Sequence, residues 1–406
     1  MTKDYAASCC VVGGGPAGMM AGYLLARAGT DVIVLEKHAD FLRDFRGDTV
    51  HPSTLQIMQE LGLYDRLLAR PHQEASRLKG RFGPIEAVFA DFSHLPTRAK
   101  FVAFMPQWDF LDFLASEARR YPSFRLLMEA EATKLIENEG KVEGVVAKGP
   151  EGEMRIRCQL VLGCDGRRSA VRSQAGLEVK DIGAPMDVLW FRISRRNDDP
   201  EEPVGSFGLG HVFVMINRGD YWQCGYVIAK GSLDKLKARG LELFRQDIEN
   251  LALFLRGRAA EIKSFDDARL LTVGVDRMTK WYRPGVLCIG DAAHTMSPVG
   301  GVGINLAVQD AVAAANALAI PLRDGSLTEA DLARVQERRE MPAQRMQWLQ
   351  VAIQNNVIKG VLGSSEQLKP PFPLRLMKWF PWLARIPARV IGLGFRPEHI
   401  DQRIFN

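Results

Sequence analysis

The sequence predicts an α/β protein with a Rossmann-type nucleotide-binding domain, an inserted antiparallel β-sheet and a helical C-terminal region. Three observations lead to this prediction. A glycine-rich turn follows an apolar run near the N-terminus, two further glycine-containing motifs lie far downstream, and short runs between them alternate apolar and polar residues. A chain of 406 residues is long enough for two or three domains.

The first glycine motif is typical of a strand that turns into a nucleotide-binding helix. Residues 8–12 form a short apolar run with β-branched side chains, and Gly13-x-Gly15-x-x-Gly18 follows at once. Pro16 suits the first helical turn, where free backbone N–H groups and the positive end of the helix dipole can hold a pyrophosphate. Gly15 leaves room for the phosphates to approach the backbone. The alternative is a tight glycine turn with no ligand.

A second predicted strand supports the interpretation as a ligand site. Residues 31–35 are mostly apolar and β-branched, and the run ends at Glu36. A carboxylate at that point can accept hydrogen bonds from a ribose diol, and its charge would disfavour a 2′-phosphate. Strand, turn, helix, strand and terminal glutamate together predict a dinucleotide site.

Two downstream motifs extend the pattern. One spans residues 163–166 (Gly-Cys-Asp-Gly) and the other spans residues 290–294 (Gly-Asp-Ala-Ala-His), after which a glycine cluster precedes a helix predicted over about 305–319. The free N–H groups at such a helix start favour a negative charge, and a reduced flavin is anionic on its pyrimidine edge. The order of the three motifs therefore indicates a flavin-dependent enzyme. The alternatives are a capping or turn aspartate for Asp291 and a buried, hydrogen-bonded histidine for His294.

The nucleotide-binding domain is predicted to be discontinuous. Runs such as 188–193, 211–216 and 221–228 alternate in the manner of antiparallel strands, which would form a sheet that covers a cofactor. The predicted domains are 1–74, 106–180 and 271–320 for nucleotide binding, 75–105 and 181–270 for the inserted domain, and 321–406 for the C-terminal helical region.

Composition excludes several classes of protein. The net charge of +5 is small for this length and basic residues are interleaved with acidic ones, so we expect no nucleic-acid partner. The N-terminus has no leader pattern and we expect no uninterrupted apolar stretch long enough to span a bilayer, so we expect a cytoplasmic protein. The six cysteines have neither CxxC spacing nor nearby histidines, which indicates buried free thiols rather than disulfides or a metal site.

The C-terminus differs from the rest of the chain. From Lys369 onward, aromatic and aliphatic residues alternate with basic ones, and no acidic residue occurs before Glu398. Such a segment can make a peripheral contact with a membrane. It can equally pack on the body of the protein or on a second subunit, and prolines interrupt it. The sequence leaves these interpretations open, together with the oligomeric state.

Together the three motifs resemble those of the single-component flavoprotein hydroxylases of the p-hydroxybenzoate hydroxylase family, over most of the first 320 residues. The resemblance makes the nucleotide-binding domain an FAD-binding Rossmann-type domain and the inserted sheet a substrate domain. It implies an FAD-dependent monooxygenase. NADH or NADPH would reduce FAD, and one oxygen atom of dioxygen would pass to an aromatic or other electron-rich apolar substrate.

The resemblance also implies which residues bind the cofactor. The residues it assigns to the ADP site are Gly13, Gly15, Ala17, Gly18 and Glu36, and those it assigns to the rest of FAD are Asp165, Asp291, Pro298, Gly301, Val302, Gly303, Ile304 and Asn305. Three weaker positions follow from the same comparison. Arg46 would lie near the flavin and pyrophosphate, Gln107 would contact the phosphate or ribose region, and Ala132 would give backbone contacts to adenine. A surface arginine and a helix-start glutamine are the alternatives for the first two.

The substrate site is less well marked. Trp222, in a predicted strand over the expected pocket, is the best candidate for a substrate-facing side chain, with an ordinary sheet aromatic as the alternative, and no catalytic side chain is assigned. Two other functions fit the fold. One is a flavin-dependent reductase of a prenyl-type or other apolar substrate, and the other is a flavin-binding scaffold without enzymatic activity. The Trp-x-Trp-x-Ile-Pro signature of flavin-dependent halogenases is absent from the sequence.

Overall fold

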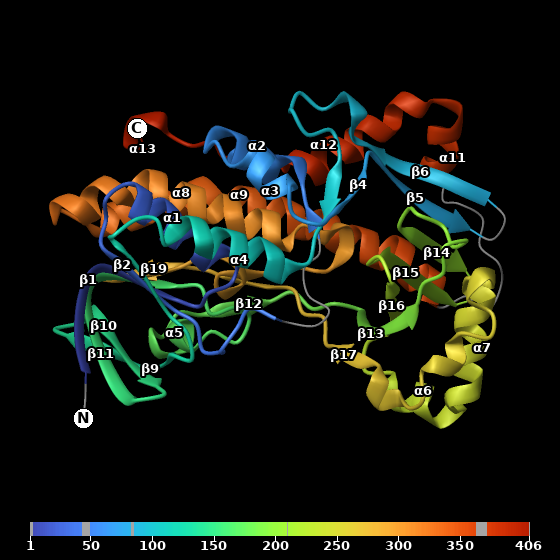
Figure 1. The fold of residues 1–406 in the computed structure, drawn as a ribbon, viewed down its shortest axis with the longest axis horizontal. Coiled ribbons are helices and arrows are strands. Elements are labelled where there is room, and N and C mark those ends of the chain that lie inside the picture. The colour runs from blue at the N-terminus through green and yellow to red at the C-terminus, as the bar shows by residue number, and fades with distance from the viewer. Residues whose placement is uncertain (1–2, 43–48, 83–84, 209, 363–371, 406) are drawn as a thin grey trace.

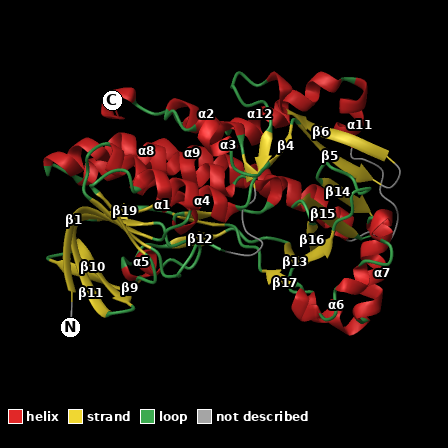
Figure 2. Ribbon diagram, viewed as in Figure 1, coloured by secondary structure: helices red, strands yellow, loops and turns green. Residues whose placement is uncertain are grey.

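The computed structural model describes residues 3–42, 49–82, 85–208, 210–362 and 372–405. In this part of the chain, two large β-sheets lie at opposite ends of the molecule (Figure 1). Long helices run above the N-terminal sheet and extend toward the second sheet (Figure 2). The fold is the α/β arrangement predicted from the sequence.

The first sheet has a parallel centre. Its strands are β1 (Lys3–Val12), β2 (Val32–Leu35), β8 (Phe124–Leu127), β9 (Glu131–Asn138), β10 (Lys141–Gly149), β11 (Gly152–Gly163), β19 (Tyr282–Arg283) and β20 (Val286–Cys288). Their order is β19-β20-β11-β1-β2-β8, with β10 and β9 added in antiparallel fashion to β11. Residues 9–12 of β1 are buried and pair in parallel with β2 and β11, as expected for a strand covered on both faces.

Four helices cover this sheet. They are α1 (Pro16–Arg27), α4 (Gln107–Ala118), α8 (Gly303–Asp324) and α9 (Glu329–Ile353). Helix α1 packs against α4 and α8, and α8 packs against α9. Contrary to the sequence expectation, the segment Val299–Asp324 is long and apolar enough to cross a membrane, but 78% of its apolar window is buried inside the protein. We therefore interpret α8 as a core helix.

The second sheet draws its strands from two separate parts of the chain. They are β5 (Arg77–Phe82), β6 (Ile85–Asp91), β13 (Met186–Ser194), β14 (Val204–Gly208), β15 (His211–Asn217), β16 (Tyr221–Ala229) and β17 (Arg269–Leu271). Their order is β17-β13-β16-β15-β14-β5-β6. Only the pair β14–β5 is parallel within this order. These strands span residues 77–91 and 186–271, and β17 ends one residue beyond the predicted interval 181–270. The predicted domain boundaries stay a prediction.

The two faces of the second sheet have different neighbours. Helices α6 (Leu233–Arg239) and α7 (Leu241–Leu251) cover the face that carries Phe191 and Trp222. The opposite face carries Trp190, which packs against the same apolar cluster as Val299, a residue just before α8. This second face is therefore the one turned toward the nucleotide-binding part.

Shorter elements join these layers. The small strands are β3 (Thr49–Val50), β4 (Gln73–Ala75), β7 (Val102–Phe104), β12 (Val179–Asp181), β18 (Asp276–Met278) and β21 (His294–Thr295), and the remaining α-helices are α2 (Pro52–Glu60), α3 (Tyr64–Leu68), α5 (Ala170–Gln174), α10 (Lys359–Leu362), α11 (Phe372–Trp379), α12 (Arg385–Leu393) and α13 (Gln402–Phe405). Helix α12 packs closely on the body, because a Cβ added to Gly392 would lie 2.9 Å from Leu95 Cδ1. Helix α11 lies beside β6.

Candidate functional site

The glycine turn between β1 and α1 contains glycines of two kinds. Gly13 has a φ of +107°, and a Cβ on it would lie 2.4 Å from the carbonyl oxygen of Cys164. A Cβ on Gly18 would lie 1.9 Å from the carbonyl oxygen of Gly13, so the protein itself requires both glycines. A Cβ on Gly15 would meet nothing within 4 Å. The free space above Gly15 is what a bound pyrophosphate needs.

The helix starts that follow the glycine residues of the first and third motifs carry no side-chain cap. Helix α1 begins at Pro16 after Gly15, and α8 begins at Gly303 after Val302, and in neither does a side chain accept a hydrogen bond from the first turn. The first N–H groups of a helix have no partner within the helix, so an uncapped start can hold an anion. Helix α5 differs, because the Ser169 hydroxyl caps it. Helices α2 and α4 also begin without a side-chain cap, so it is the glycines beside the starts of α1 and α8 that make these two suit the charged parts of FAD.

Glu36 lies where the sequence predicted a ribose ligand. Its carboxylate accepts hydrogen bonds of 3.0 Å from the backbone N–H groups of Gly14 and His38. These contacts fix the carboxylate beside the glycine turn at the end of β2. The backbone oxygen of Glu36 accepts a 2.8 Å hydrogen bond from Ala130, which places the nearby Ala132 at the same edge of the sheet.

The structure leaves the cofactor contacts predicted for Gln107 and Arg46 open. Gln107 is the first residue of α4, which packs on α1. Arg46 lies outside the described residues. Cofactor contacts for Gln107, Ala132 and Arg46 stay predictions.

The second motif is tied to the third by side-chain contacts. The Asp165 carboxylate accepts hydrogen bonds from the Ser169 hydroxyl at 2.6 Å and the Ala170 N–H at 2.7 Å, so it shapes the turn into α5. The Arg172 guanidinium then donates to the carbonyl oxygen of Ala292 at 2.9 Å. The direct contact of Asp165 with cofactor remains a prediction.

The third motif lies against the start of α1. Gly290 has a φ of +61°, and a Cβ on it would lie 3.0 Å from the Cβ of Ala17. This close approach places the half-buried Asp291 next to the glycine turn. Segments that are far apart in the sequence therefore meet at one place, as the sequence predicted for a flavin site.

A buried polar network behind this loop was not predicted. The Asp310 carboxylate accepts hydrogen bonds from the Gly290 N–H at 3.0 Å and from Arg339 Nε at 2.9 Å, and it lies 2.6 Å from His294 Nε2. Burial opposes ionisation of Asp310, but His294 and Arg339 more than offset it and lower the pKa of the carboxyl. His294 is therefore the buried, hydrogen-bonded histidine that the sequence left as an alternative. An aspartate within the apolar helix α8 was the one available signal.

The residues around the start of α8 contact residues 49–54. A Cβ on Gly301 would lie 2.3 Å from Thr49 Oγ1. The side-chain oxygen of Asn305 accepts hydrogen bonds from the His51 N–H at 2.8 Å and the Thr54 hydroxyl at 2.7 Å. The side chain of Asn305 thus joins α2 to α8.

The other residues predicted around the start of α8 lie close together. Val302 and Ile304 are buried, whereas Pro298 and Gly303 are half-buried. Their contacts with FAD stay predictions.

Trp222 is the ordinary sheet aromatic that the sequence left as an alternative, and the structure does not support a substrate-facing side chain at this position. Its side chain is fully buried, packs with the α7 side of the sheet, and donates a 2.8 Å hydrogen bond from Nε1 to Asp199. It therefore faces away from the nucleotide-binding part and is a core aromatic residue. The neighbouring strand β13 instead places Trp190 on the opposite face, against the same apolar cluster as Val299. Successive residues of a strand point to opposite faces, so an assignment that is wrong by one position reverses the facing.

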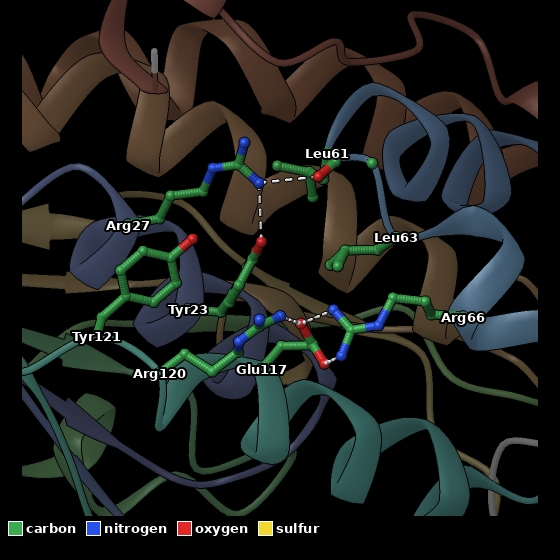
Figure 3. Close-up of a pocket in the computed structure, with 9 residues that line it drawn as sticks. Tyr23, Arg27, Leu61, Leu63, Arg66, Glu117, Arg120 and Tyr121 are labelled. Atoms are coloured by element: carbon green, nitrogen blue, oxygen red, sulfur yellow. Dashed lines mark hydrogen bonds and ion pairs between the residues drawn. The ribbon is translucent and has the colours of Figure 1, made fainter.

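A surface cavity of about 350 Å³ lies between the C-terminal ends of α1 and α4 (Figure 3). Arg66 and Arg120 both donate to the Glu117 carboxylate, the second at 3.1 Å. Arg27 donates to the Tyr23 hydroxyl at 3.0 Å, and burial raises the pKa of Tyr23 to about 12. The cavity is lined by the C-terminal end of α1, so it is separate from the glycine turn at the other end of that helix.

Comparisons with known proteins agree with this geometry. The FAD binding domain family matches residues 6–348. A 6-methylpretetramide 4-monooxygenase from Streptomyces rimosus is 32% identical over 346 residues, which cover 84% of this chain and 82% of that protein. A rifampicin monooxygenase from Streptomyces venezuelae is 29% identical over 321 residues, which cover 74% of this chain and 61% of that protein. The crystal structure of a p-nitrophenol 4-monooxygenase from Pseudomonas putida has a TM-score of 0.73 at 19% identity and covers 99% of this chain and 96% of that one.

The fold, the glycine turn and the two uncapped helix starts define a flavin-dependent oxidoreductase. The chain belongs to the FAD binding domain family and is an FAD-dependent aromatic monooxygenase of the p-hydroxybenzoate hydroxylase type. It uses NADH or NADPH as co-substrate. The sequence resemblance, the predicted fold class and the predicted cofactor are thereby confirmed, and the monooxygenase is favoured over the reductase and the scaffold.

Proposed function

We propose that this enzyme hydroxylates a multi-ring phenolic compound similar to 6-methylpretetramide. The observation that carries the proposal is the match to the monooxygenase named for that compound, at 32% identity across 84% of this chain and 82% of the relative. A match that covers most of both chains includes the parts that surround the substrate as well as the parts that hold FAD.

The inner face of the second sheet supports an apolar substrate. Val188, Trp190 and Val214 lie on this face, among residues that pack toward Val299 and the C-terminal helices. A Cβ on Gly225 would lie 3.1 Å from the Trp190 ring, so a glycine at this point makes room for the indole above β16. Apolar and aromatic side chains around a few polar groups are typical of sites for drug-sized aromatic ligands.

The residues around the three motifs fit FAD. Gly15 and the start of α1 would hold the pyrophosphate, Glu36 the ribose, and the start of α8 the flavin ring. When bound, FAD supplies the redox chemistry between NADH or NADPH, dioxygen and the substrate. The protein contributes backbone N–H donors that stabilise negative charge, and buried residues such as Val302 that exclude water from the start of α8.

Substrate-stimulated oxidation of NADPH tests the substrate class. A multi-ring phenol such as 6-methylpretetramide should stimulate oxidation about tenfold more than 2,4-dichlorophenol at equal concentration, because a pocket shaped for the larger ring system discriminates through apolar contacts. With labelled dioxygen, one labelled oxygen atom should appear in the product by mass spectrometry.

Two outcomes would contradict the proposal. Faster and fully coupled oxidation of the small phenol would assign the enzyme to simple phenols. A converted multi-ring product without label would point to the reductase that the sequence left as an alternative.

A further inference from the structure

The C-terminal segment carries an unusual share of the exposed aromatic surface. We call residues 372–389, from the start of α11 into α12, the aromatic-basic segment. Among the described residues, five tryptophan and phenylalanine side chains are exposed, and four of them lie in this segment. These four are Phe372, Trp379, Phe380 and Trp382, and Ile386 beside them is also exposed. Soluble proteins rarely leave such a group of side chains in water unless the surface contacts a partner.

The same segment is basic and contains no acidic residue. No aspartate or glutamate occurs between residues 367 and 397. The basic side chains of the aromatic-basic segment are exposed, and none forms an ion pair with a described carboxylate; they are Arg375, Lys378, Arg385 and Arg389. Their charge is therefore available to an anionic partner.

The segment is fixed to the body on its other side. Ala388 and Leu393 of α12 are buried, and the ring nitrogen Nδ1 of His51 lies 2.8 Å from the carbonyl oxygen of Ile391. Helix α11 lies beside β6. The exposed aromatic side chains thus lie on the side of the segment that does not pack on the protein. Packing on the body, one alternative left open by the sequence, explains only the buried side of the segment.

We propose that the aromatic-basic segment binds peripherally to an anionic phospholipid surface. Tryptophan suits the boundary between headgroups and acyl chains, because one part of its ring is apolar and its N–H is polar. Basic residues around an apolar helix face are attracted to anionic lipid. A second copy of the chain fits less well, since a two-fold interface would place this basic surface against itself.

Co-sedimentation with vesicles tests the proposal on the full-length, FAD-loaded protein. Wild type should bind phosphatidylcholine vesicles that contain 30% phosphatidylglycerol, and bind pure phosphatidylcholine much more weakly. The double variant Lys378→Gln/Arg385→Gln should bind the anionic vesicles about tenfold or more weakly, because two attractive charges are lost. Trp379→Ser/Trp382→Ser should also reduce binding.

Matched variants control for charge and for exposed tryptophan in general. Lys134→Gln/Lys148→Gln removes two exposed charges from β9 and β10, and Trp348→Ser removes an exposed indole from α9. Both should bind vesicles as wild type does. Unchanged flavin absorbance and melting temperature identify variants that are still folded.

Three results would overturn the proposal. The first is that wild type stays in the supernatant at low salt. The second is that wild type binds neutral and anionic vesicles equally well. The third is that the variants of the aromatic-basic segment bind as well as their control variants. Sedimentation velocity supplies a fourth. A dimer that dissociates in Trp379→Ser/Trp382→Ser would assign the surface to a second copy of the chain instead.

Discussion

Two regions of the molecule differ in which atoms form their binding surface. One is the nucleotide-binding unit, made of the first sheet with α1 and α8, and the other is the second sheet. In the first, the backbone makes the site, and glycines are present because a Cβ would collide with backbone atoms or fill the ligand's space. In the second, side chains make the surface, and strand alternation decides which ones face the nucleotide-binding unit. Motifs therefore identify the first region, whereas only strand facing identifies the second.

The largest expected effect separates the two kinds of glycine in the turn. Gly18→Ala would place a Cβ 1.9 Å from a backbone oxygen, so we expect loss of both the native fold and FAD binding. Gly15→Val meets open space at a φ of −73°, so the apoprotein should fold and melt like wild type. Its FAD affinity should fall about a hundredfold or more, since the added side chain would displace the charge-assisted hydrogen bonds that the start of α1 would donate to phosphate. Apoprotein melting and FAD titration measure the two properties separately.

Equal behaviour of the two variants would break the comparison. If Gly15→Val failed to fold, the glycine would be required by the protein fold itself and not by the ligand. If it bound FAD like wild type, the pyrophosphate would lie elsewhere.

The next effect tests facing in the second sheet. Trp222→Ala should destabilise the protein by about 3–5 kcal/mol, because it removes a fully buried ring from a packed core. It also removes the Nε1 donor to Asp199. Trp190→Ala, on the other face, should cost less stability but reduce the fraction of NADPH oxidation that yields hydroxylated product. Urea unfolding and product yield per NADPH are the two measurements.

The opposite result for the two variants would contradict the assigned orientations of Trp222 and Trp190. Uncoupled oxidation in a fully stable Trp222→Ala, with normal coupling in Trp190→Ala, would restore Trp222 as the substrate-facing residue.

The smallest effect concerns His51, the residue before α2, whose backbone N–H donates to Asn305 of α8. Burial lowers the pKa of His51 from 6.5 to about 4, while its hydrogen bond to Ile391 acts weakly in the other direction. Because the folded pKa lies below the unfolded one, the unfolded chain takes up the proton first as the pH falls. This contribution to stability is present above pH 6.5 and is lost between pH 6.5 and about pH 4. It amounts to up to about 3 kcal/mol, at 1.36 kcal/mol per pKa unit.

Urea unfolding of wild type and His51→Gln at pH 7.5 and pH 5 measures this contribution. Wild type should lose more stability than the variant over that range. An identical pH dependence would show that His51 titrates alike in the folded and unfolded chains.

The sequence predicts the structure correctly where local backbone chemistry decides the outcome. The turn at Gly13, Gly15 and Gly18 followed from spacing alone, and so did the position of Glu36 at the end of β2. Glycine spacing is readable in this way because the absence of a Cβ has the same steric meaning in any surrounding.

Only the tertiary structure decided the contacts between distant side chains. Asp310 joins Gly290 to Arg339, and Asn305 joins α2 to α8, although neither pairing has a fixed spacing in the sequence. Trp222 faces the core because the register of β16 against β13 and β15 sets it there. Side chains alternate between faces with a period of two, so a run of apolar residues fits either facing until the packing of whole sheets and helices selects one.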